Sequence, residues 1–390
     1  MRILHTADWH LGSRLGGYDR TDELFGQVEI VCRLAEEHAV DVLLVAGDVF
    51  ERRALPELTK HLADTLRPYV LRGLHVVLLP GNHDNREHFR MMRALLTLDQ
   101  EGQGHVHVVQ TREIFTIDSV QFAAIPYPIP EALEPYRPDA IGATESHVVQ
   151  STAYASLVRS VIDALDPSLP AVFVSHITVA GVTTPSEREL TYDDDIRLGT
   201  ADLPLASNLA YVALGHIHQP QSLPHPIPCH YSGSIDRYNM GERDDAKQVL
   251  LVEVPPIGAA TVTAIPIEAT PFHDIRVAAA ELGVLPDRYP DLDRAFVRVV
   301  LDCEVGDDPV ALRRQVNDLC ARCLEVRCEG VGAAAVSALD ATPRDYRTTA
   351  LDYLRARHVD DPDLPELEWR ASNLVDEVVK QEMGDAAGVS

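Results

Sequence analysis

The feature that most constrains the fold of this chain is a repeated unit in which a short apolar run ends in a residue of metal-binding type. The first run, residues 2–7, leads into Asp8 and His10 within the stretch TADWHLG. Later runs end in the same way, often beside a glycine, and read DVLLVAGDVF, HVVLLPGNHDN, AVFVSH and AYVALGHIH. Short Val- and Leu-rich runs of this kind are typical of strands that are buried on both faces. The sequence therefore predicts buried strands whose ends carry carboxylate, amide and imidazole groups.

Helical patterns lie between these strands. Apolar residues recur at helical spacing over residues 24–35 and again over residues 58–66. Alternating strands and helices predict an α/β fold built on layered sheets. The same reading predicts a hairpin of residues 115–117 and 120–125, a helix over 144–165, and strands over 210–214, 249–254 and 261–267.

The polar groups at the strand ends are expected to meet in one pocket. In open α/β sheets the carboxyl ends of the strands form the crevice that binds ligands. Each group alone has a structural explanation, because Asp and Asn favour turns and His can satisfy backbone groups. Together they are numerous enough for two metal ions. We expect one ion at Asp8, His10 and His218, the other at Asn82, His176 and His216, and Asp48 as the bridge between them.

A two-metal site of this composition suits hydrolysis of a phosphate ester. Two ions about 3.5–4 Å apart can clamp the attacking and leaving oxygens and can lower the pKa of a bound water. Mixed nitrogen and oxygen ligands favour Mn²⁺ or Fe²⁺ over Mg²⁺. His83 follows Asn82 without being needed as a ligand, so we expect it to donate a proton to the departing oxygen. Asp84 is expected to orient the His83 ring.

Length and cysteine content place further limits. A chain of 390 residues has room for two or three domains. Its six cysteines are scattered, which predicts reduced thiols in a cytoplasmic protein. Cys320 and Cys323 form a CxxC pair that suits core packing or, with Cys328 and Cys303, a zinc site. No run is long enough to span a membrane, and the start of the chain does not resemble a signal peptide.

The charge of the chain bears on possible partners. A formal net charge of −26 should repel nucleic acid, whose binding depends on phosphate contacts. Any DNA contact must therefore be local, metal-mediated or supplied by a partner. Arg86, Arg90 and Arg93 share one helix face, and Arg52 and Arg53 follow the Asp48 loop. These arginines suit either DNA contacts or an ordinary solvated surface.

The order of the motifs resembles a known superfamily. DxH, GDxF, GNHD, a lone His after a strand, and GHxH occur in the order found in calcineurin-like metallophosphoesterases. The stretches HTADWHLG, VAGDVFE, LPGNHDN, ALGHIHQPQ and YSGSID resemble the SbcD family of double-strand-break repair nucleases. This resemblance implies a four-layer αββα sandwich that carries two Mn²⁺ ions, with His83 as the proton donor. It also implies a homodimer and a partner ATPase of the SbcC type, which has long coiled coils.

The resemblance carries further expectations and one departure. It implies that Ser232, Ser234 and Arg237 lie near the DNA strand. Some relatives have a histidine after the GDVF motif that approaches the phosphate, whereas this chain has Glu51. That histidine contact is therefore missing, and His83 is expected to act more alone.

Three regions and three functions are expected. Residues 1–270 would form the nuclease domain, 271–340 a small α+β capping domain that contacts DNA, and 341–390 C-terminal helices that bind the ATPase. In the capping region we expect strands over 296–305 and 324–329 around a helix over 309–323. An apolar stripe at residues 374–379 suits either the ATPase or the chain's own core. The leading function is an exonuclease on double-stranded DNA ends and an endonuclease on single-stranded or hairpin DNA. The alternatives are a phosphodiesterase or phosphatase for small nucleotides or phosphoproteins, and a non-catalytic DNA-end tether.

Overall fold

The structure is a computed structural model that describes residues 1–51, 55–96, 105–137, 146–182, 196–330 and 370. The chain forms two compact units. The first comprises residues 1–275, 286–298 and 319–325, and the second comprises the remaining described residues. Everything that positions the candidate site belongs to the first unit.

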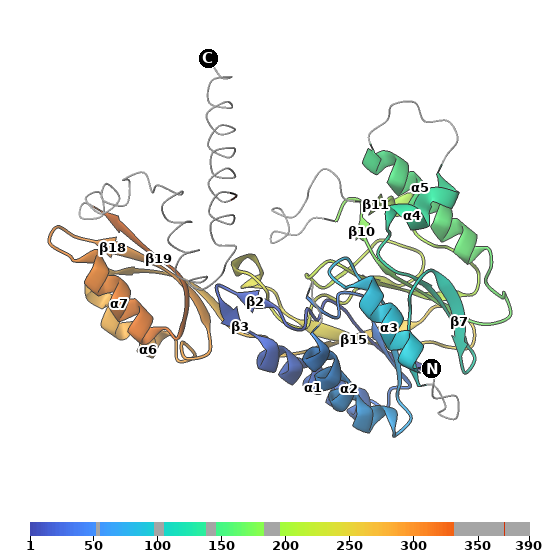
Figure 1. Cartoon of the computed structure of the whole chain (residues 1–390), viewed down its shortest axis with the longest axis horizontal. Coiled ribbons are helices and arrows are strands. Elements are labelled where there is room, and N and C mark those ends of the chain that lie inside the picture. Colours follow the sequence, from blue (N-terminus) through green and yellow to red (C-terminus); the bar gives the residue numbers. More distant parts are fainter. Residues whose placement is uncertain (52–54, 97–104, 138–145, 183–195, 331–369, 371–390) are drawn as a thin grey trace, which may run out of the picture. The chain divides into compact units, whose positions relative to one another are not determined.

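Two six-stranded sheets form the centre of the first unit (Figure 1). In the first sheet the strand order is β16-β15-β1-β4-β5-β6, and in the second it is β13-β14-β12-β9-β8-β7. The strands of the first sheet are β1 (Arg2–Thr6), β4 (Val42–Val45), β5 (His75–Leu78), β6 (Val106–Val108), β15 (Gln248–Glu253) and β16 (Thr261–Pro266). Those of the second are β7 (Glu113–Ile117), β8 (Val120–Ile125), β9 (Ala171–His176), β12 (Leu209–Gly215), β13 (Gln221–Ser222) and β14 (Cys229–Tyr231). The predicted hairpin is confirmed as β7 and β8, which pair antiparallel.

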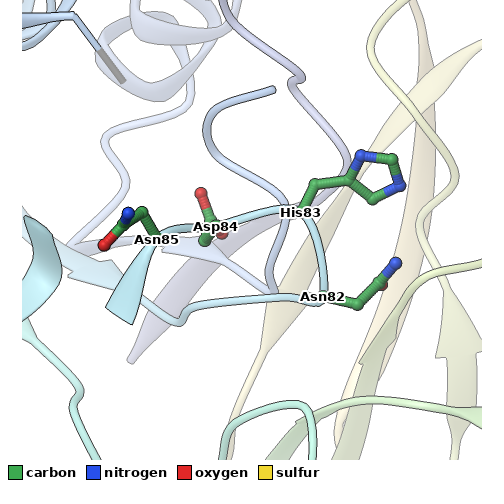
Figure 2. A pocket seen from close by; sticks show the side chains of 4 residues that line it. All are labelled: Asn82, His83, Asp84 and Asn85. Carbon is green, nitrogen blue, oxygen red and sulfur yellow. The ribbon is translucent and has the colours of Figure 1, made fainter. Parts of the chain in front are cut away.

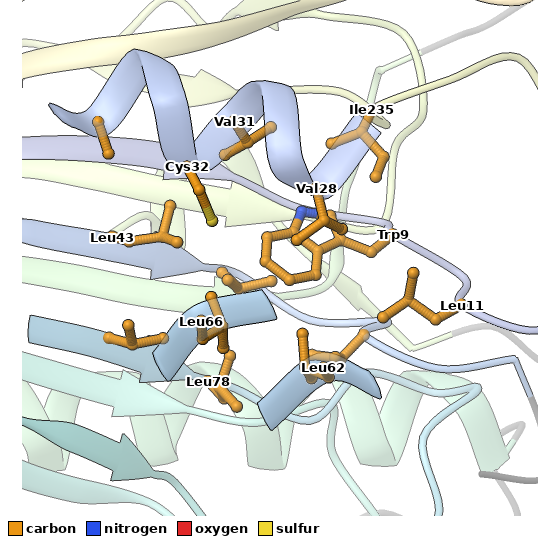
Figure 3. Close-up of a cluster of buried hydrophobic side chains, with 14 of the residues drawn as sticks. Trp9, Leu11, Val28, Val31, Cys32, Leu43, Leu62, Leu66, Leu78 and Ile235 are labelled. Atoms are coloured by element: carbon orange, nitrogen blue, oxygen red, sulfur yellow. The ribbon is translucent and has the colours of Figure 1, made fainter. Parts of the chain in front are cut away.

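Helices cover the outer face of each sheet. Helices α1 (Thr21–Glu37), α2 (Pro56–Val70) and α3 (Arg86–Leu96) contribute to one core with the first sheet, in which Val28 and Leu62 pack with Leu43 (Figure 3). Helix α5 (Ser146–Ile162) contributes to a second core with the other sheet. A third core lies between the sheets and joins Val42 to Val172. These three cores define four layers, so the α/β class and the αββα sandwich are confirmed.

The parallel register brings the strand ends together. Strands β1, β4 and β5 are parallel neighbours, with Thr6 opposite Val45 and Val45 opposite Leu78. In the second sheet β9 and β12 are parallel, with His176 opposite Gly215. The loops that leave these ends therefore start from the same edge of each sheet, where ligand sites form in α/β folds.

A three-stranded sheet and two helices make up the later part of the described chain. The strand order is β17-β18-β19, with bounds Phe272–Ala278, Phe296–Cys303 and Arg322–Gly330. The predicted helix over 309–323 is too long, because α7 (Pro309–Leu319) ends earlier and Cys323 lies on β19. Leu324, Val326 and Cys328 alternate with charged residues, a strand pattern that begins sooner than we expected. The predicted helices over 346–358 and 365–383 lie outside the described residues.

The remaining elements are short. They are β2 (Arg14–Leu15), β3 (Tyr18–Asp19), β10 (Thr178–Val179), β11 (Arg197–Leu198), α4 (Pro130–Leu133), α6 (Leu285–Arg288) and 3₁₀ turns at Glu134–Tyr136, Thr200–Asp202, Met240–Glu242 and Ala279–Val284. Within the described residues, no helix combines the length and apolar character needed to cross a membrane.

Candidate metal centre

The backbone is strained at the residues that we expected to be ligands. Asp8, His10, Asp48 and His216 have φ angles of 54°, 44°, 50° and 97°. Residues other than glycine rarely adopt this region, at a cost of roughly 1–3 kcal/mol each. The conformation is held by backbone hydrogen bonds between the first two loops, since the Asp8 amide donates to the Gly47 carbonyl at 3.0 Å and the His10 amide to the Asp48 carbonyl at 2.9 Å. The strain is therefore concentrated where the strand ends meet.

Glycines precede the ligand residues because the chain segments approach too closely for a side chain. A Cβ at Gly215 would lie 1.9 Å from the carbonyl oxygen of Ala46. A Cβ at Gly47 would lie 2.0 Å from Nδ1 of His176. Neither contact is tolerable, so the glycine in the GD and GH motifs allows the two sheets to bring their ends together.

A Gly215→Ala variant is expected to disrupt the site. The new methyl group must push β12 away from the end of β4, which displaces His216. A misplacement of about 1 Å can cost about 10²-fold in rate, and we expect a loss of that order in phosphodiester hydrolysis, with weaker Mn²⁺ binding. Gly26→Ala in α1 is the matched control, because a Cβ there meets nothing within 4 Å. Equal activity of the two variants, measured on folded protein, would contradict the predicted close approach.

One group of candidate ligands consists of Asp8, His10 and His218. Their ligand atoms lie within 4.8 Å of one another, and Nε2 of His10 lies 3.1 Å from Nε2 of His218. The Asp8 carboxylate accepts the backbone N–H of His216, with its two oxygens at 3.1 and 3.2 Å. The structure thus brings together the three residues that we expected at the first ion.

The second group gathers around the amide of Asn82. Its Oδ1 lies 3.0 Å from Nε2 of His176 and 2.9 Å from Nδ1 of His216. Oδ2 of Asp48 lies 3.3 Å from Nε2 of His176 and 3.7 Å from Nε2 of His10. Asp48 is therefore placed between the two groups, and all seven expected ligands surround one centre.

The donor atoms in this centre fit metal ions. Nδ1 of His10 faces Glu51 at 3.1 Å and Nδ1 of His218 faces Glu242 at 3.0 Å. Carboxylates only accept hydrogen bonds, so each Nδ1 carries the proton and, in neutral rings, the two Nε2 lone pairs face each other. The same holds for His176, whose Nδ1 donates to the Ala46 carbonyl at 2.8 Å. Lone pairs that converge in this way are favourable when a cation lies among them, and the carboxylate and imidazole donors suit Mn²⁺, Fe²⁺ or Zn²⁺.

The electrostatics of the site also call for positive charge. Burial lowers the pKa of His176 and of His218, but carboxylates outweigh it and raise both values to about 9. Asp48 is the main cause for His176 and Glu242 for His218. His216 differs, because burial and the neighbouring His176 lower its pKa to about 3. The buried carboxylates thus hold protons on two rings, and bound divalent cations would replace those protons.

The GNHDN loop presents His83 to an open pocket of about 440 Å³ that is lined by Asn82, His83, Asp84 and Asn85. Figure 2 shows the side chains of Asn82 and His83 on one side of the loop and those of Asp84 and Asn85 on the other. His83 is half-buried, and its backbone N–H donates to Oδ1 of Asp48 at 2.8 Å. The imidazole is therefore beside the metal-binding groups without belonging to either of the two groups above.

The partner of His83 differs from our expectation. Asp84 accepts backbone N–H groups of Val49, Phe50 and Gly81 at 2.8 to 3.0 Å, so its carboxylate braces two loops. Oε1 of Glu51 instead faces Nδ1 of His83 at 2.8 Å. The expectation that Asp84 orients His83 is thereby corrected. Glu51, noted from the sequence only as a missing histidine, orients it.

Two further residues of the site were missed. Glu242 is buried beside His218, and Tyr238 donates its hydroxyl hydrogen to the Trp9 carbonyl at 2.6 Å. Tyr238 thereby fixes the loop that carries Asp8 and His10. Both residues lie in the region 235–247, which has little regular structure and no recognisable motif. Only the segment YSGSID just before it could have drawn attention to this region.

The structure narrows the set of expected DNA contacts. Ser232 and Ser234 are fully buried, so neither presents its hydroxyl to the surface and the expectation for them is corrected. The YSGSID segment packs inside because Ala7 and Ser234 form a parallel bridge. Arg237 is half-buried and donates to the backbone carbonyls of Asp245 and Thr270. Its guanidinium group therefore supports the fold.

The arginines near the pocket have different surroundings. Arg86 is half-buried and donates to the Tyr127 carbonyl, and Arg93 pairs with Glu113 at 2.9 Å. Arg90 is exposed on α3 and pairs with Glu87. Arg52 and Arg53 lie outside the described residues.

The fold and the site define a class. The family model for calcineurin-like phosphoesterases matches residues 1–220. The chain therefore belongs to the calcineurin-like phosphoesterase family, and it is a metal-dependent phosphodiester hydrolase.

More specific relatives share a single name, that of the SbcD subunit of the nuclease SbcCD. The chain is 30% identical over 275 residues to this protein from Bacillus subtilis, which covers 67% of this chain and 68% of the relative. It is 32% identical over 314 residues to the one from Rhodobacter capsulatus, covering 75% and 76%. The protein of the same name from Escherichia coli K12 is 29% identical over 264 residues, covering 65% and 64%. Within the phosphoesterases, the chain belongs to the SbcD family.

Proposed function

We propose that this chain is a Mn²⁺-dependent DNA nuclease that works with an SbcC-type ATPase in DNA break repair and recombination. We propose exonuclease action on double-stranded ends and endonuclease action on single-stranded or hairpin DNA. The observation that carries the proposal is the gathering of seven ligand groups and His83 around one open pocket. The shared name of the relatives supports the substrate and the partner.

The ligand assignment follows from the two groups of side chains. Asp8, His10 and His218 would hold one ion, and Asn82, His176 and His216 the other, with Asp48 between them. Two bound divalent ions would neutralise the charge of the phosphodiester and activate a water for attack. The strained loops hold these groups in place before substrate arrives, so little reorganisation is needed during the reaction.

His83 supplies the proton for the leaving oxygen. Its Nδ1–H donates to Glu51, which leaves Nε2 as the atom that carries the transferable proton. Burial lowers the pKa of His83, but the hydrogen bond to Glu51 and the charge of Asp48 outweigh it and raise the pKa. A proton on Nε2 at neutral pH is what a general acid requires.

The acidic character of the chain shapes how DNA would bind. A net charge of −26 opposes binding far from the site, so the metal ions and a few local cations must provide the attraction. Arg90 suits such a contact because it is exposed on α3, which follows the GNHDN loop. We propose that residues 271–340 cap the nuclease domain and add contacts to DNA, and that the ATPase supplies much of the affinity.

Cleavage of end-labelled linear duplex in the presence of Mn²⁺ tests this function. The assay compares the chain with and without the ATPase and ATP, beside hydrolysis of a chromogenic phosphodiester. Cleavage of duplex ends that rises with ATPase and ATP would support the proposal. Hydrolysis of the small ester without any action on DNA, even with the ATPase, would instead identify a small-molecule phosphodiesterase.

Deletion of residues 341–390 tests the proposed partner region. We expect the shortened chain to hydrolyse the small phosphodiester at the full rate, because every candidate ligand lies before residue 220. We expect it to lose co-purification with the ATPase. Unchanged association would contradict the assignment of this region to partner binding.

A further inference from the structure

The imidazoles of the two metal positions are supported in different ways. At the position of Asp8, both histidines are backed by carboxylates. Oε2 of Glu51 faces Nδ1 of His10 at 3.1 Å, and Oε1 of Glu242 faces Nδ1 of His218 at 3.0 Å. Each contact fixes Nε2 as the ligand atom and turns it toward the other ring.

At the position of Asn82 the support is neutral. Nδ1 of His176 donates to the backbone carbonyl of Ala46 at 2.8 Å, and Nδ1 of His216 lies 2.9 Å from the amide oxygen of Asn82. Asn82 itself is neutral and exposed. This position thus has fewer fixed negative charges among its ligands and their supports.

The two glutamates are themselves held firmly. Glu242 is fully buried, and its second oxygen accepts from Lys247 at 2.7 Å. Lys247 also donates to the carbonyl of His218 at 3.0 Å, so the pair fixes the backbone of the ligand as well as its ring. Glu51 is partly exposed and uses its second oxygen for His83. One glutamate therefore serves a ligand alone, and the other joins a ligand to the proton donor.

A carboxylate behind an imidazole fixes its orientation and makes it a stronger donor, and loss of such a partner typically costs about 10–100-fold in metal affinity. We infer that Glu51 and Glu242 are positioning residues that make the two metal positions unequal, so that the ion at Asp8, His10 and His218 binds more tightly than the ion at Asn82, His176 and His216. The inference rests on the ligand assignment proposed above. It predicts ordered loading, with the Asn82 position filled last and emptied first.

Calorimetric titration of the metal-free full chain with Mn²⁺ tests this inference. We expect wild type to bind two ions with different affinities. Glu51→Gln and Glu242→Gln should each weaken the tighter step by about 10–100-fold and leave the weaker step unchanged. Asn82→Ala should do the reverse, because it removes a ligand of the other position. Glu113→Gln is the matched control, since Glu113 pairs with Arg93 and His107 away from these ligands.

The possible outcomes separate the inference from the proposed function. Wild type that binds fewer than two Mn²⁺ ions would overturn the dinuclear site and the inference with it. Two bound ions with glutamate variants that match wild type, or that weaken only the weaker step, would overturn the inference alone. Glu242→Gln leaves a buried lysine without its main partner and can unfold the chain. The double variant Glu242→Gln/Lys247→Met removes that charge, and Glu51→Gln at the partly exposed site gives an independent reading.

The same variants separate the two roles of Glu51. Loss of a ligand support alone should be overcome by excess Mn²⁺, so Glu242→Gln/Lys247→Met should recover its kcat at saturating metal. Glu51→Gln should recover metal binding but retain a lowered kcat, because His83 has lost the group that orients it. Full recovery of kcat in Glu51→Gln would restrict this residue to support of His10 and would overturn its link to the proton donor.

Discussion

Replacement of Asp48 by alanine is expected to abolish phosphodiester hydrolysis. Oδ2 of Asp48 lies 3.7 Å from Nε2 of His10 and 3.3 Å from Nε2 of His176, so one carboxylate serves both groups of ligands. Its loss removes negative charge from both metal positions. It also releases the backbone N–H of His83, which donates to Oδ1 of Asp48 at 2.8 Å. Metal binding and the position of the proton donor are therefore lost together.

Two measurements check this expectation. Elemental analysis should find fewer than two Mn²⁺ ions per chain in the variant, and hydrolysis of a chromogenic phosphodiester should be undetectable. Asp48→Asn keeps the shape and an oxygen but removes the charge, so it should retain partial metal binding. Asp64→Asn is the control, because Asp64 is exposed on α2 and pairs only locally with Lys60. Appreciable turnover by Asp48→Ala would exclude a bridging role.

The sequence predicted the strand ends because their pattern is local. Short apolar runs such as VLLV and AVFVSH specify buried strands on their own, and parallel register then places their ends on one edge. A glycine beside the ligand marks the same places, as Gly47 and Gly215 show. The fold and the gathering of seven ligand groups therefore follow from residues that lie within a few positions of each strand.

The supporting residues could not be predicted in the same way. Glu242 and Lys247 reach His218 from a segment without strand or helix periodicity, and their contacts span 24 and 29 residues of sequence. Side-chain directions in loops have no period from which to read them. The roles of Glu51 and Asp84 were confused for this reason, because both follow a GD or GNHD motif and only the backbone geometry decides which carboxylate faces His83.

Replacement of His83 by alanine is expected to lower the rate of DNA cleavage by about 10²–10⁴-fold, the usual contribution of a general acid. Two Mn²⁺ ions per chain should remain, because His83 belongs to neither group of ligands around Asp8 and Asn82. His88→Ala is the matched control, since His88 lies on the same segment but contacts Thr59 and Phe50. Loss of metal in the His83 variant would make this residue a ligand.

The leaving group provides a sharper test of the role of His83. Cleavage of DNA expels an alkoxide of high pKa, which needs a proton as the bond to phosphorus breaks. Hydrolysis of a nitrophenyl phosphodiester expels a phenolate of low pKa, which leaves readily without one. His83→Ala should therefore slow DNA cleavage far more than hydrolysis of the nitrophenyl ester. Equal losses on both substrates would show that His83 positions the phosphate and does not protonate the leaving oxygen, because orientation of the phosphate matters equally for the two.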